Sequence, residues 1–394
     1  MNEVLLIGPL PKRFGGKKDG GVAQHVATLL SVYKTKGINY RYLSNEATGW
    51  SKKSSEDFNQ VKLGAPNIVT AIKCFLFVMN SFPSDLWRPF IFLRAMKAVY
   101  IVSCLDLSSF SGVVIHAHST LNFMGPLIKK FSSATKLITT VHSYHAILES
   151  KDRQRQAIVK LVKMHIDTSD VVVHVSPFDH CSGEELGVIL DKSFVVPNYV
   201  PKSNRLSCVV KNYDVIFVGS LIPRKRISLM IHALAGISQK LRVLIIGAGD
   251  EKDKIENFVS VSHHDIRHLE SASNDLVRNY MAQSRVLVVP SESESFGLVY
   301  LEALQEGAKV IGYCKSIDYF VDSFRQTGML KGFLLEKYLF GVNESETSSA
   351  LRIKIEDALS GPDISDANRI NLQKSIDQVF GFDIFVKKLV ELYE

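Results

Sequence analysis

The chain has 394 residues, of which 46% are hydrophobic and 22% charged, a balance typical of a soluble folded enzyme. This composition excludes disorder, collagen and a disulfide scaffold as descriptions of the whole chain, and the length predicts two or three domains. The 47 Lys and Arg residues against 40 Asp and Glu give a net charge of +7, which suits anionic ligands or an anionic membrane without choosing between them.

The five cysteines are an odd number and form no CxxC pair, which favours a reducing, cytoplasmic environment over a disulfide framework or a zinc knuckle. The first apolar run has no charged region before it and no cleavage site after it, so no signal peptide is expected. No run of 18 apolar residues occurs, so no membrane-spanning helix is predicted.

Short, dense apolar segments recur along the chain and predict strands buried on both faces of a parallel sheet. The predicted strands are 4–7, 113–115, 137–141, 171–175, 215–218, 243–246, 286–289 and 310–311. Longer amphipathic segments predict helices at 21–37, 122–132, 153–169, 226–240, 250–260, 273–283 and 297–307. Strand alternating with helix is typical of doubly wound α/β folds.

The series of strand, loop, helix and strand begins twice, first at the N-terminus and again near residue 214. Between the two series, the polar segment 196–214 carries two prolines and is interpreted as a linker. We therefore expect an N-terminal Rossmann-like domain over residues 1–200 and a second over 201–363. The tail 364–394 is expected to be helical, with a break at Gly381, and to pack back on the first domain.

Residues 67–105 combine dense aromatic and aliphatic side chains with interleaved cations and few acids. The cations are Lys73, Arg88, Arg94 and Lys97. Two interpretations stay open: ordinary core helices, or a surface that touches anionic lipid through its basic and aromatic side chains.

The segment 286–307 contains the strongest candidates for ligand-binding residues. Its buried strand ends at Pro290, a polar loop follows, and the next helix begins near Phe296 and Gly297. The backbone N–H groups of Phe296, Gly297 and Leu298 are expected to be free at the helix start, where the helix dipole adds positive potential. Such a helix start is a ready site for phosphate.

Two carboxylates flank this expected anion site. Glu294 lies in the loop before the helix, and Glu302 lies more than one turn into it. Carboxylates repel phosphate but accept hydrogen bonds from hydroxyls, so they suit a sugar and a ribose on either side of the phosphates. The alternative is two solvated glutamates, which a helix start favours in any case.

The segment from Glu294 to Glu302 resembles the E-x-F-G-x-x-x-x-E element of retaining glycosyltransferases of the GT-B fold, specifically glycosyltransferase family four (glycosyl transferases group 1). The other motifs of that family follow in order over nearly the whole chain. They are Gly20-Gly21-Val22, Val114–His118, Thr140–His142, Pro197-Asn198, Phe217–Gly219 with Pro223 and Lys225, and Ile246–Gly249. The resemblance implies two Rossmann-like, doubly wound domains with an interdomain cleft.

The resemblance also implies roles for single residues. Glu294 is implied to bind donor-sugar hydroxyls and Glu302 the ribose, while Lys225 neutralises the departing diphosphate and His142 reaches the donor sugar. Glu294, Lys225 and His142 form the expected catalytic set. Further donor-binding residues are Gly21, Ser220, Arg224, Phe296, Gly297 and Leu298, and Gly20 and His118 are expected on the acceptor side.

The chain departs from the family pattern after the strand 215–218. Ser220 stands where the family usually has arginine, and Arg226 stands where glycine is common. Our hypothesis is that Arg224 or Arg226 supplies the missing positive charge.

Several histidines could instead indicate a metal site, because an H-x-H pair on a strand is a known ligand spacing. These are His116, His118, His142 and His145. No accompanying Asp or Cys is evident, and no D-x-D pair exists to hold diphosphate through a metal. We therefore expect no metal and no cofactor, with a nucleoside-diphosphate sugar, UDP- or GDP-linked, as substrate.

The predicted function is metal-independent sugar transfer with retention, to a glycan or lipid-linked saccharide of a bacterial surface polysaccharide. The protein is expected in the cytoplasm, peripherally at the inner face of the membrane, and no nucleic-acid partner is expected. One alternative is a nucleotide-sugar-binding or scaffold protein without turnover, which Ser220 favours. Another is an NAD-dependent oxidoreductase, suggested by Gly247-Ala-Gly249, although Lys252 replaces the third glycine of that motif.

Overall fold

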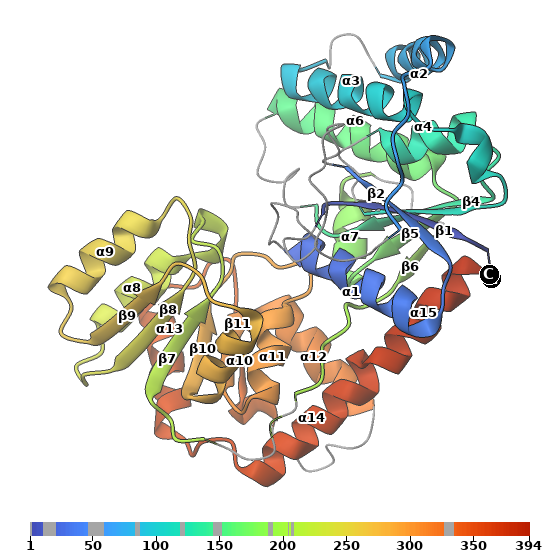
Figure 1. The fold of residues 1–394 in the computed structure, drawn as a ribbon. Coiled ribbons are helices and arrows are strands. Elements are labelled where there is room, and N and C mark those ends of the chain that lie inside the picture. The colour runs from blue at the N-terminus through green and yellow to red at the C-terminus, as the bar shows by residue number, and fades with distance from the viewer. Residues whose placement is uncertain are drawn as a thin grey trace. The chain divides into compact units, whose positions relative to one another are not determined.

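The structure is a computed structural model that describes residues 2–10, 21–45, 59–82, 87–118, 123–144, 152–187, 192–203, 205, 209–326 and 335–394. The chain divides into two compact units. The N-terminal unit is Met1–Pro197 together with Val386–Glu394, and the C-terminal unit is Asn198–Phe385. Each unit contains one six-stranded parallel sheet with helices on both faces (Figure 1).

The sheet of the N-terminal unit has the order β2-β1-β3-β4-β5-β6. Its strands are β1 (Val4–Gly8), β2 (Tyr40–Ser44), β3 (Val114–Ala117), β4 (Lys136–Val141), β5 (Val171–His174) and β6 (Ser193–Val195). The helices of this unit are α1 (Gly21–Lys36), α2 (Ile68–Ser81), α3 (Pro89–Ser103), α4 (Met124–Phe131), α6 (Asp152–Thr168) and α7 (Pro177–Glu185), with a short 3-10 helix η3 (Leu107–Phe110).

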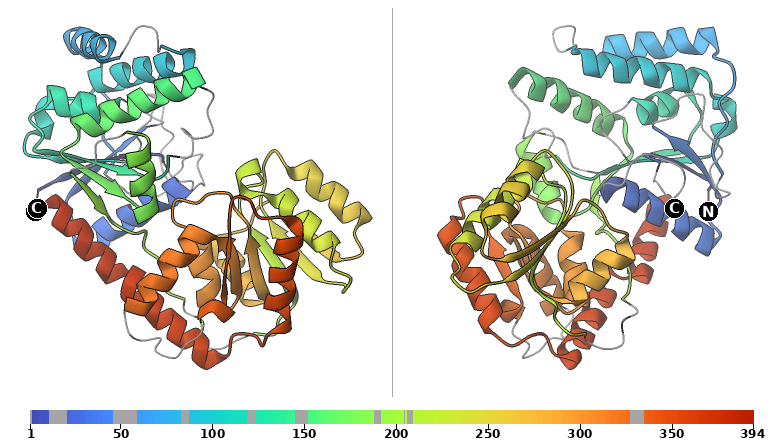
Figure 2. Two further views of the ribbon diagram at one scale, coloured as in Figure 1. Left: turned by 180° about the vertical axis from the view of Figure 1, so that it is seen from behind. Right: turned by 60° about the vertical axis from the view of Figure 1, so that its left-hand side comes forward.

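Strand β1 lies between β2 and β3 in the N-terminal sheet and is fully buried, which explains its unbroken apolar sequence. Leu5 and Ile7 on one face of β1 belong to a core formed with α2, α3, α4 and α6. Those helices lie over one face of the sheet, while α1 and the end of α15 run along the other (Figures 1 and 2).

The last helix of the chain is fixed to the N-terminal unit by its final tyrosine. Helices α14 (Asp366–Phe380) and α15 (Phe382–Tyr393) are separated at Gly381, where the sequence predicts the break. The hydroxyl of Tyr393 lies 2.7 Å from Nδ1 of His116 and is hydrogen-bonded to the hydroxyl of Tyr33. All three side chains are buried, so the hydroxyl of Tyr393 satisfies two polar groups that water cannot reach.

Replacing Tyr393 with Phe should lower the free energy of unfolding by about 1 to 3 kcal/mol, because His116 and Tyr33 would each lose a buried partner. Urea denaturation of the full chain measures the effect. Tyr100→Phe, at a tyrosine that is 51% exposed, is the control and should change stability little. Equal stabilities for the two variants would contradict the assigned anchoring role.

The sheet of the C-terminal unit has the order β12-β11-β10-β7-β8-β9. Its strands are β7 (Tyr213–Val218), β8 (Arg242–Ile246), β9 (Asp265–Leu269), β10 (Ser284–Val289), β11 (Lys309–Tyr313) and β12 (Leu339–Val342). Its helices are α8 (Ile227–Ala235), α9 (Lys252–Val261), α10 (Asn274–Ala282), α11 (Leu298–Gln305), α12 (Cys314–Gln326) and α13 (Ser348–Ser360), with 3-10 helices η4 (Pro223–Lys225) and η5 (Leu335–Lys337).

The direction of chain progression reverses between β7 and β10 in this sheet. The chain moves from β7 outward to β8 and β9, returns to β10, and then moves the other way to β11 and β12. Helices α8 and α13 therefore pack on one face, and α10, α11 and α14 on the other (Figures 1 and 2). The loops that follow β7 and β10 diverge at this point, which is where open α/β sheets bind ligands.

The eight strands predicted from apolar segments are all present, and the expected pair of doubly wound α/β domains is confirmed. The strands that the apolar pattern missed are β2, β6, β9 and β12, which are the edge strands of the two sheets and are partly exposed. None of the helices that the structure describes has the length and apolar character needed to cross a bilayer.

Candidate functional site

A buried ion pair joins the loops after β7 and β10. Lys225 ends the 3-10 helix η4, and its Nζ donates to Oε1 of Glu294 in the loop after β10. The hydroxyl of Ser291 donates to the same oxygen at 2.6 Å. The backbone N–H of Glu292 donates to the carbonyl of Arg224 at 2.8 Å, which ties the two loops together. The switch point of the sheet therefore places the predicted Glu294 and Lys225 side by side.

The charge of Glu294 is maintained although the side chain is only 8% exposed. Burial by itself raises the pKa of this carboxyl, but Lys225, the Ser291 hydroxyl and Arg224 outweigh burial and lower the pKa below its ordinary value. Oε2 of Glu294 has a more distant cation, since Nη1 of Arg224 lies 3.8 Å away. The arrangement leaves Oε2 as the oxygen better able to accept a hydroxyl from a ligand.

The two arginines of this loop have different environments. Nη1 of Arg224 donates to the carbonyl of Ser293 at 2.6 Å and lies beside Glu294. Arg226 has a φ of +49°, and its guanidinium donates to the carbonyls of Pro290, Asn343 and Glu344 at 2.6, 2.8 and 2.9 Å. Arg226 thus binds carbonyls of two backbone segments, whereas Arg224 lies beside Glu294, and the hypothesis that Arg224 supplies the charge missing at Ser220 stays a prediction. Ser220 itself is exposed after β7.

Helix α11 begins directly after this loop, at Gly297. Gly297 has a φ of +91°, and a Cβ there would lie 2.5 Å from the ring of Tyr300, so the position requires glycine. Within the described residues, the N–H groups of Phe296, Gly297 and Leu298 donate no hydrogen bond to the protein. The Phe296 ring packs in the core against Phe320. These free N–H groups at a helix start suit an anion.

Glu302 lies on α11 and is half-buried. Its carboxylate has no hydrogen-bonded or ion-paired partner in the part of the chain that the structure describes. Burial raises its pKa, and the charge of Glu306 adds to this rise while Arg278 opposes it. One turn later, Glu306 receives hydrogen bonds from Nε of Arg205 and Nε of Arg278, each at 2.9 Å. Of these two acids on one helix, Glu306 is used by the fold and Glu302 is available to a ligand.

Exchange of these two acids for glutamine should have opposite effects on stability. At pH 7 the folded state keeps Glu302 ionised against a raised pKa, so Glu302→Gln should raise the thermal midpoint, and the gain should disappear below the unfolded pKa of about 4.3. Glu306→Gln should cost about 1 to 3 kcal/mol, because two arginines lose their charged acceptor. Thermal unfolding at pH 7 and pH 4 measures both, and a destabilised Glu302→Gln protein would contradict the assignment.

The N-terminal unit holds a second polar cluster, at the carboxyl ends of β3 and β4. Nδ1 of His118 and Nε2 of His142 share a hydrogen bond at 3.1 Å, and the ring of His25 on α1 lies 4.9 Å from that of His142. Nε2 of His118 is buried and lacks a hydrogen-bond partner among the described residues. The structure therefore brings the predicted His118 and His142 together and adds His25, one turn after Gly21.

Other predicted positions in this unit are less informative. Gly21 is the first residue of α1, and a Cβ there would meet nothing within 4 Å. Gly20 and His145 lie outside the described residues. His116 is committed to the fold, because Nε2 lies 2.7 Å from the Thr140 hydroxyl and Nδ1 is bound to Tyr393.

Three imidazoles of this cluster could hold a metal ion, since ligand atoms of His25, His118 and His142 lie within 4.8 Å of one another. Three histidines without a carboxylate are a nitrogen donor set of the kind that zinc accepts. The expectation that the reaction needs no metal stays a prediction.

Acid should destabilise the N-terminal unit through these histidines. Burial lowers the pKa of His116 to about 3, and it lowers those of His118 and His142 as well. A histidine of the unfolded chain has a pKa of about 6.5 and binds a proton below that pH, whereas these buried histidines of the folded chain do not. The free energy of unfolding therefore decreases as the pH falls. His116 alone should cost about 2 kcal/mol at pH 5.

Urea denaturation between pH 7 and pH 5 measures this slope. His118→Gln should reduce it, whereas His232→Gln, at an exposed histidine of the C-terminal unit, should leave it unchanged. A flat profile in the unmodified protein would show that the buried imidazoles do not control acid stability.

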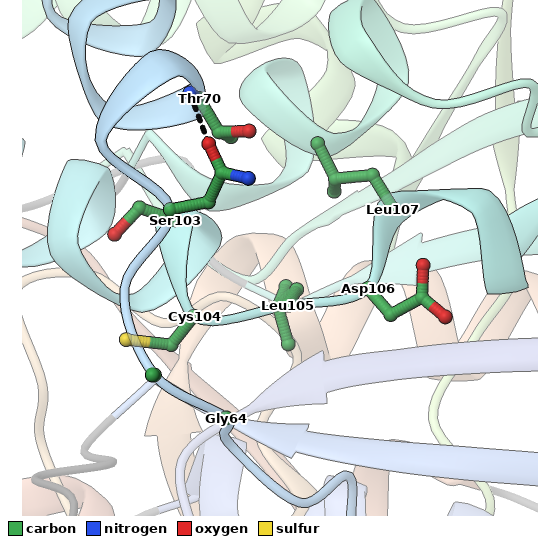
Figure 3. Close-up of a pocket in the computed structure, with 9 residues that line it drawn as sticks. Gly64, Thr70, Ser103, Cys104, Leu105, Asp106 and Leu107 are labelled. Atoms are coloured by element: carbon green, nitrogen blue, oxygen red, sulfur yellow. Dashed lines mark hydrogen bonds between the residues drawn. The ribbon is translucent and has the colours of Figure 1, made fainter.

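A pocket of about 430 Å³ lies away from both clusters, between the start of α2 and the end of α3 (Figure 3). Its lining includes Asn67, Thr70, Ser103 and Asp106 and contains no cationic side chain. Such a lining does not suit phosphate, and none of the predicted site residues contributes to it.

The glycines that suggested an NAD site have a structural reason. A Cβ on Gly247 would lie 1.9 Å from the carbonyl oxygen of Gly219, and one on Gly249 would lie 2.4 Å from that of Leu221. The segment after β8 therefore needs glycine to pass close to the loop after β7. The Gly247-Ala-Gly249 pattern is explained without a dinucleotide.

Two parallel, doubly wound sheets with this strand order define the GT-B fold, which solved structures confirm over the whole chain. Sucrose-phosphate synthase from Thermosynechococcus elongatus superposes with a TM-score of 0.70 at 18% identity and covers 100% of this chain and 98% of its own. Anabaena HepE in complex with UDP gives 0.66 at 14%, and WaaG, a glycosyltransferase involved in lipopolysaccharide biosynthesis, gives 0.65 at 12%. Each of these two covers 100% of this chain and 99% of its own. At these identities the likeness concerns the fold alone.

Residues 203–338 match the family model of glycosyl transferases group 1. The matched residues lie in the C-terminal unit, where the resemblance expected from the motifs is confirmed.

Curated relatives agree with this family. An uncharacterised glycosyltransferase of Methanocaldococcus jannaschii is 30% identical over 203 residues, which cover 50% of this chain and 55% of that protein. An uncharacterised protein in the cps region of Klebsiella pneumoniae is 25% identical over 262 residues, 61% of this chain and 71% of that protein. N-acetyl-alpha-D-glucosaminyl L-malate synthase of Bacillus anthracis is 27% identical over 190 residues, 45% and 49% respectively. The chain spans about half the length of the first and third of these relatives.

Several residues of the two clusters were not predicted. Ser291 orients Glu294 from three residues earlier, Glu306 and Arg278 form the fold's own ion pair, and His25 joins the histidines. His25 follows Gly21 by four residues, a helical spacing that could have indicated it. Ser291 gave no signal, because serine is common in any loop.

Proposed function

We propose that the protein is a retaining, metal-independent glycosyltransferase that uses a nucleoside-diphosphate sugar. The observation that supports this most is the group around Glu294: a buried carboxylate with two adjacent cations, at the switch point and beside the free N–H groups of α11. Cations and N–H groups suit a diphosphate, while Oε2 of Glu294 and the unpaired Glu302 suit hydroxyls on either side of it. UDP is the favoured nucleotide because one GT-B neighbour is a complex with UDP.

The proposed donor site has a definite charge balance. Without a ligand, Glu294 neutralises Lys225 and approaches Arg224. On binding, the diphosphate would take up the positive charge of Lys225, Arg224 and the start of α11, and Glu294 would accept a sugar hydroxyl. Fixed cations of this kind stabilise the charge that develops on a departing phosphate. Ser220, Gly297 and the backbone of Phe296 and Leu298 complete the proposed donor contacts.

The proposed chemistry needs no nucleophile from the protein. The acceptor hydroxyl attacks the anomeric carbon from the face that the diphosphate leaves, and a departing phosphate oxygen takes the hydroxyl proton. The configuration at the anomeric carbon is then retained. His142 is proposed to contact the donor sugar and Gly21 the donor as well, while Gly20 and His118 are proposed to contact the acceptor.

The proposed acceptor is a glycan or lipid-linked saccharide of a bacterial surface polysaccharide. Support comes from the relative in a cps region and from the fold shared with a protein of lipopolysaccharide biosynthesis. The proposal places the protein in the cytoplasm at the inner face of the membrane, because a lipid-linked acceptor stays at that surface. The described cysteines are free, which agrees with a reducing environment.

Thermal unfolding with UDP, GDP, ADP, CMP and NAD, each in EDTA, tests the donor site. UDP at 100 times its dissociation constant should add about 2.7 kcal/mol of stability. Lys225→Ala should weaken UDP binding about tenfold or more and lower UDP release from UDP-sugars about 100-fold. Glu302→Ala should abolish the shift, and Lys374→Ala, at an exposed lysine of α14, should leave it unchanged.

The other outcomes separate the alternatives. A shift with NAD alone would indicate an oxidoreductase, and a nucleotide shift without any release of UDP from UDP-sugars would indicate a binding or scaffold protein. Loss of the shift in EDTA would contradict metal independence. Inversion at the anomeric carbon of the product, read by NMR, would contradict the retaining mechanism.

A further inference from the structure

Helix α2 carries large apolar side chains on a face that the described residues leave exposed. Of the 17 exposed large hydrophobic residues among the described positions, nine belong to α2 and α3. Those of α2 are Ile68 (75% exposed), Val69 (62%), Ile72 (54%), Phe75 (38%), Leu76 (53%) and Met79 (36%). The other eight are spread over several elements of both units, so the concentration on α2 and α3 needs a specific explanation.

The exposed residues of α2 form one continuous stripe. Positions 68, 72, 75, 76 and 79 recur at three- and four-residue spacing, which places them on one face of a helix. Cys74 and Val78 on the opposite face are fully buried against the core of the N-terminal unit. Helix α2 lies outermost in this unit and packs on α3 (Figures 1 and 2). Helix α2 therefore packs against the core on one side and carries apolar side chains on both sides.

Cations predominate around this stripe, with the exposed Asp106 as an acid near the start of α2. Lys73 is exposed at its edge, and α3 adds Lys97 between exposed Leu93 and Tyr100. Residues 59–105 contain five Lys and Arg against one Asp, so this segment carries +4 of the net +7 of the chain. The single acid, Asp85, lies outside the described residues. Cations beside an exposed apolar face match the headgroups and acyl boundary of an anionic membrane.

The dimensions of α2 exclude a spanning role. Its 14 residues give a length of about 21 Å, which is shorter than the hydrocarbon core of about 30 Å. A helix of this length with an apolar stripe and cations at its edge lies in the plane of the interface.

Self-association is the main alternative occupant of this face. A twofold dimer brings the same patch of both copies together, so Lys73 and Lys97 would face a mainly cationic surface, with Asp106 as an acid near the start of α2. Lysine is also depleted in protein interfaces. The charge of the patch therefore favours lipid over a second copy.

We propose that α2, with the adjoining face of α3, docks the protein on an anionic lipid bilayer, with Ile68, Ile72 and Leu76 entering the acyl boundary and Lys73 and Lys97 meeting lipid phosphates. Membrane contact belongs to the proposed function, but this surface stands on exposure and charge that do not depend on the transferase site. The two proposals can therefore fail separately.

Cosedimentation of the full chain with vesicles of phosphatidylcholine, with and without phosphatidylglycerol, tests the surface. The unmodified protein should bind vesicles that contain phosphatidylglycerol, and binding should weaken with salt. The double variant Ile72→Ser, Leu76→Ser should bind about tenfold more weakly or worse, because each side chain leaves an apolar environment. Lys73→Gln should reduce the preference for phosphatidylglycerol.

The matched control is Val261→Ser with Ile353→Ser, which changes two residues of the C-terminal unit that are 82% and 53% exposed. This control should bind vesicles as the unmodified protein does. No binding to phosphatidylglycerol, or equal binding of both double variants, would overturn the proposal. A dimer in light scattering that Ile72→Ser, Leu76→Ser converts to a monomer would assign the face to self-association. The UDP shift measured on the same variants should be unchanged, and its absence in every protein would contradict the donor site alone.

Discussion

The reversal of strand order between β7 and β10 is the constraint on which the candidate site depends. Parallel pairing aligns the carboxyl ends of these neighbouring strands, so the loops that follow them must begin side by side. One loop supplies Lys225 and Arg224, and the other supplies Ser291 and Glu294. Residues almost 70 positions apart in the chain thus meet without any long-range side-chain recognition. The sheet determines the meeting place, and the loops need only carry groups of opposite charge.

The buried charged residues of the C-terminal unit differ in whether the described part of the fold provides them with a partner. Lys309 is buried, and its ammonium donates to the carbonyls of Ala358 and Gly361 at the end of α13, where the helix dipole favours a cation. Glu306 is likewise satisfied by arginines. Glu302 has a raised pKa and no such partner among the described residues, so its charge opposes folding at neutral pH. We propose that this carboxylate serves a ligand rather than the fold.

The sequence predicted those parts of the molecule whose physical cause is local. Inner strands such as β1 and β10 are buried on both faces and must be continuously apolar, so they can be recognised in the sequence. Strand β9 reads DIRHL because an edge strand is half solvated, and its sequence resembles a loop. The roles of Glu294 and Lys225 were inferred from a family resemblance, while their contact follows from topology. Ser291 and His25 were missed because their neighbours come from other elements.

The segment 67–105 shows why composition could not decide between a core helix and a surface helix. Both interpretations require dense apolar residues, and on α2 both are correct, on opposite sides of the same helix. Cys74 and Val78 pack inward, while Ile72, two positions before Cys74, and Leu76, two positions before Val78, face outward. A helix with one apolar face buried would normally carry polar residues on the other. Because α2 is apolar there too and cations outnumber acids in its described surroundings, the choice rests on charge, and charge favours an anionic lipid surface.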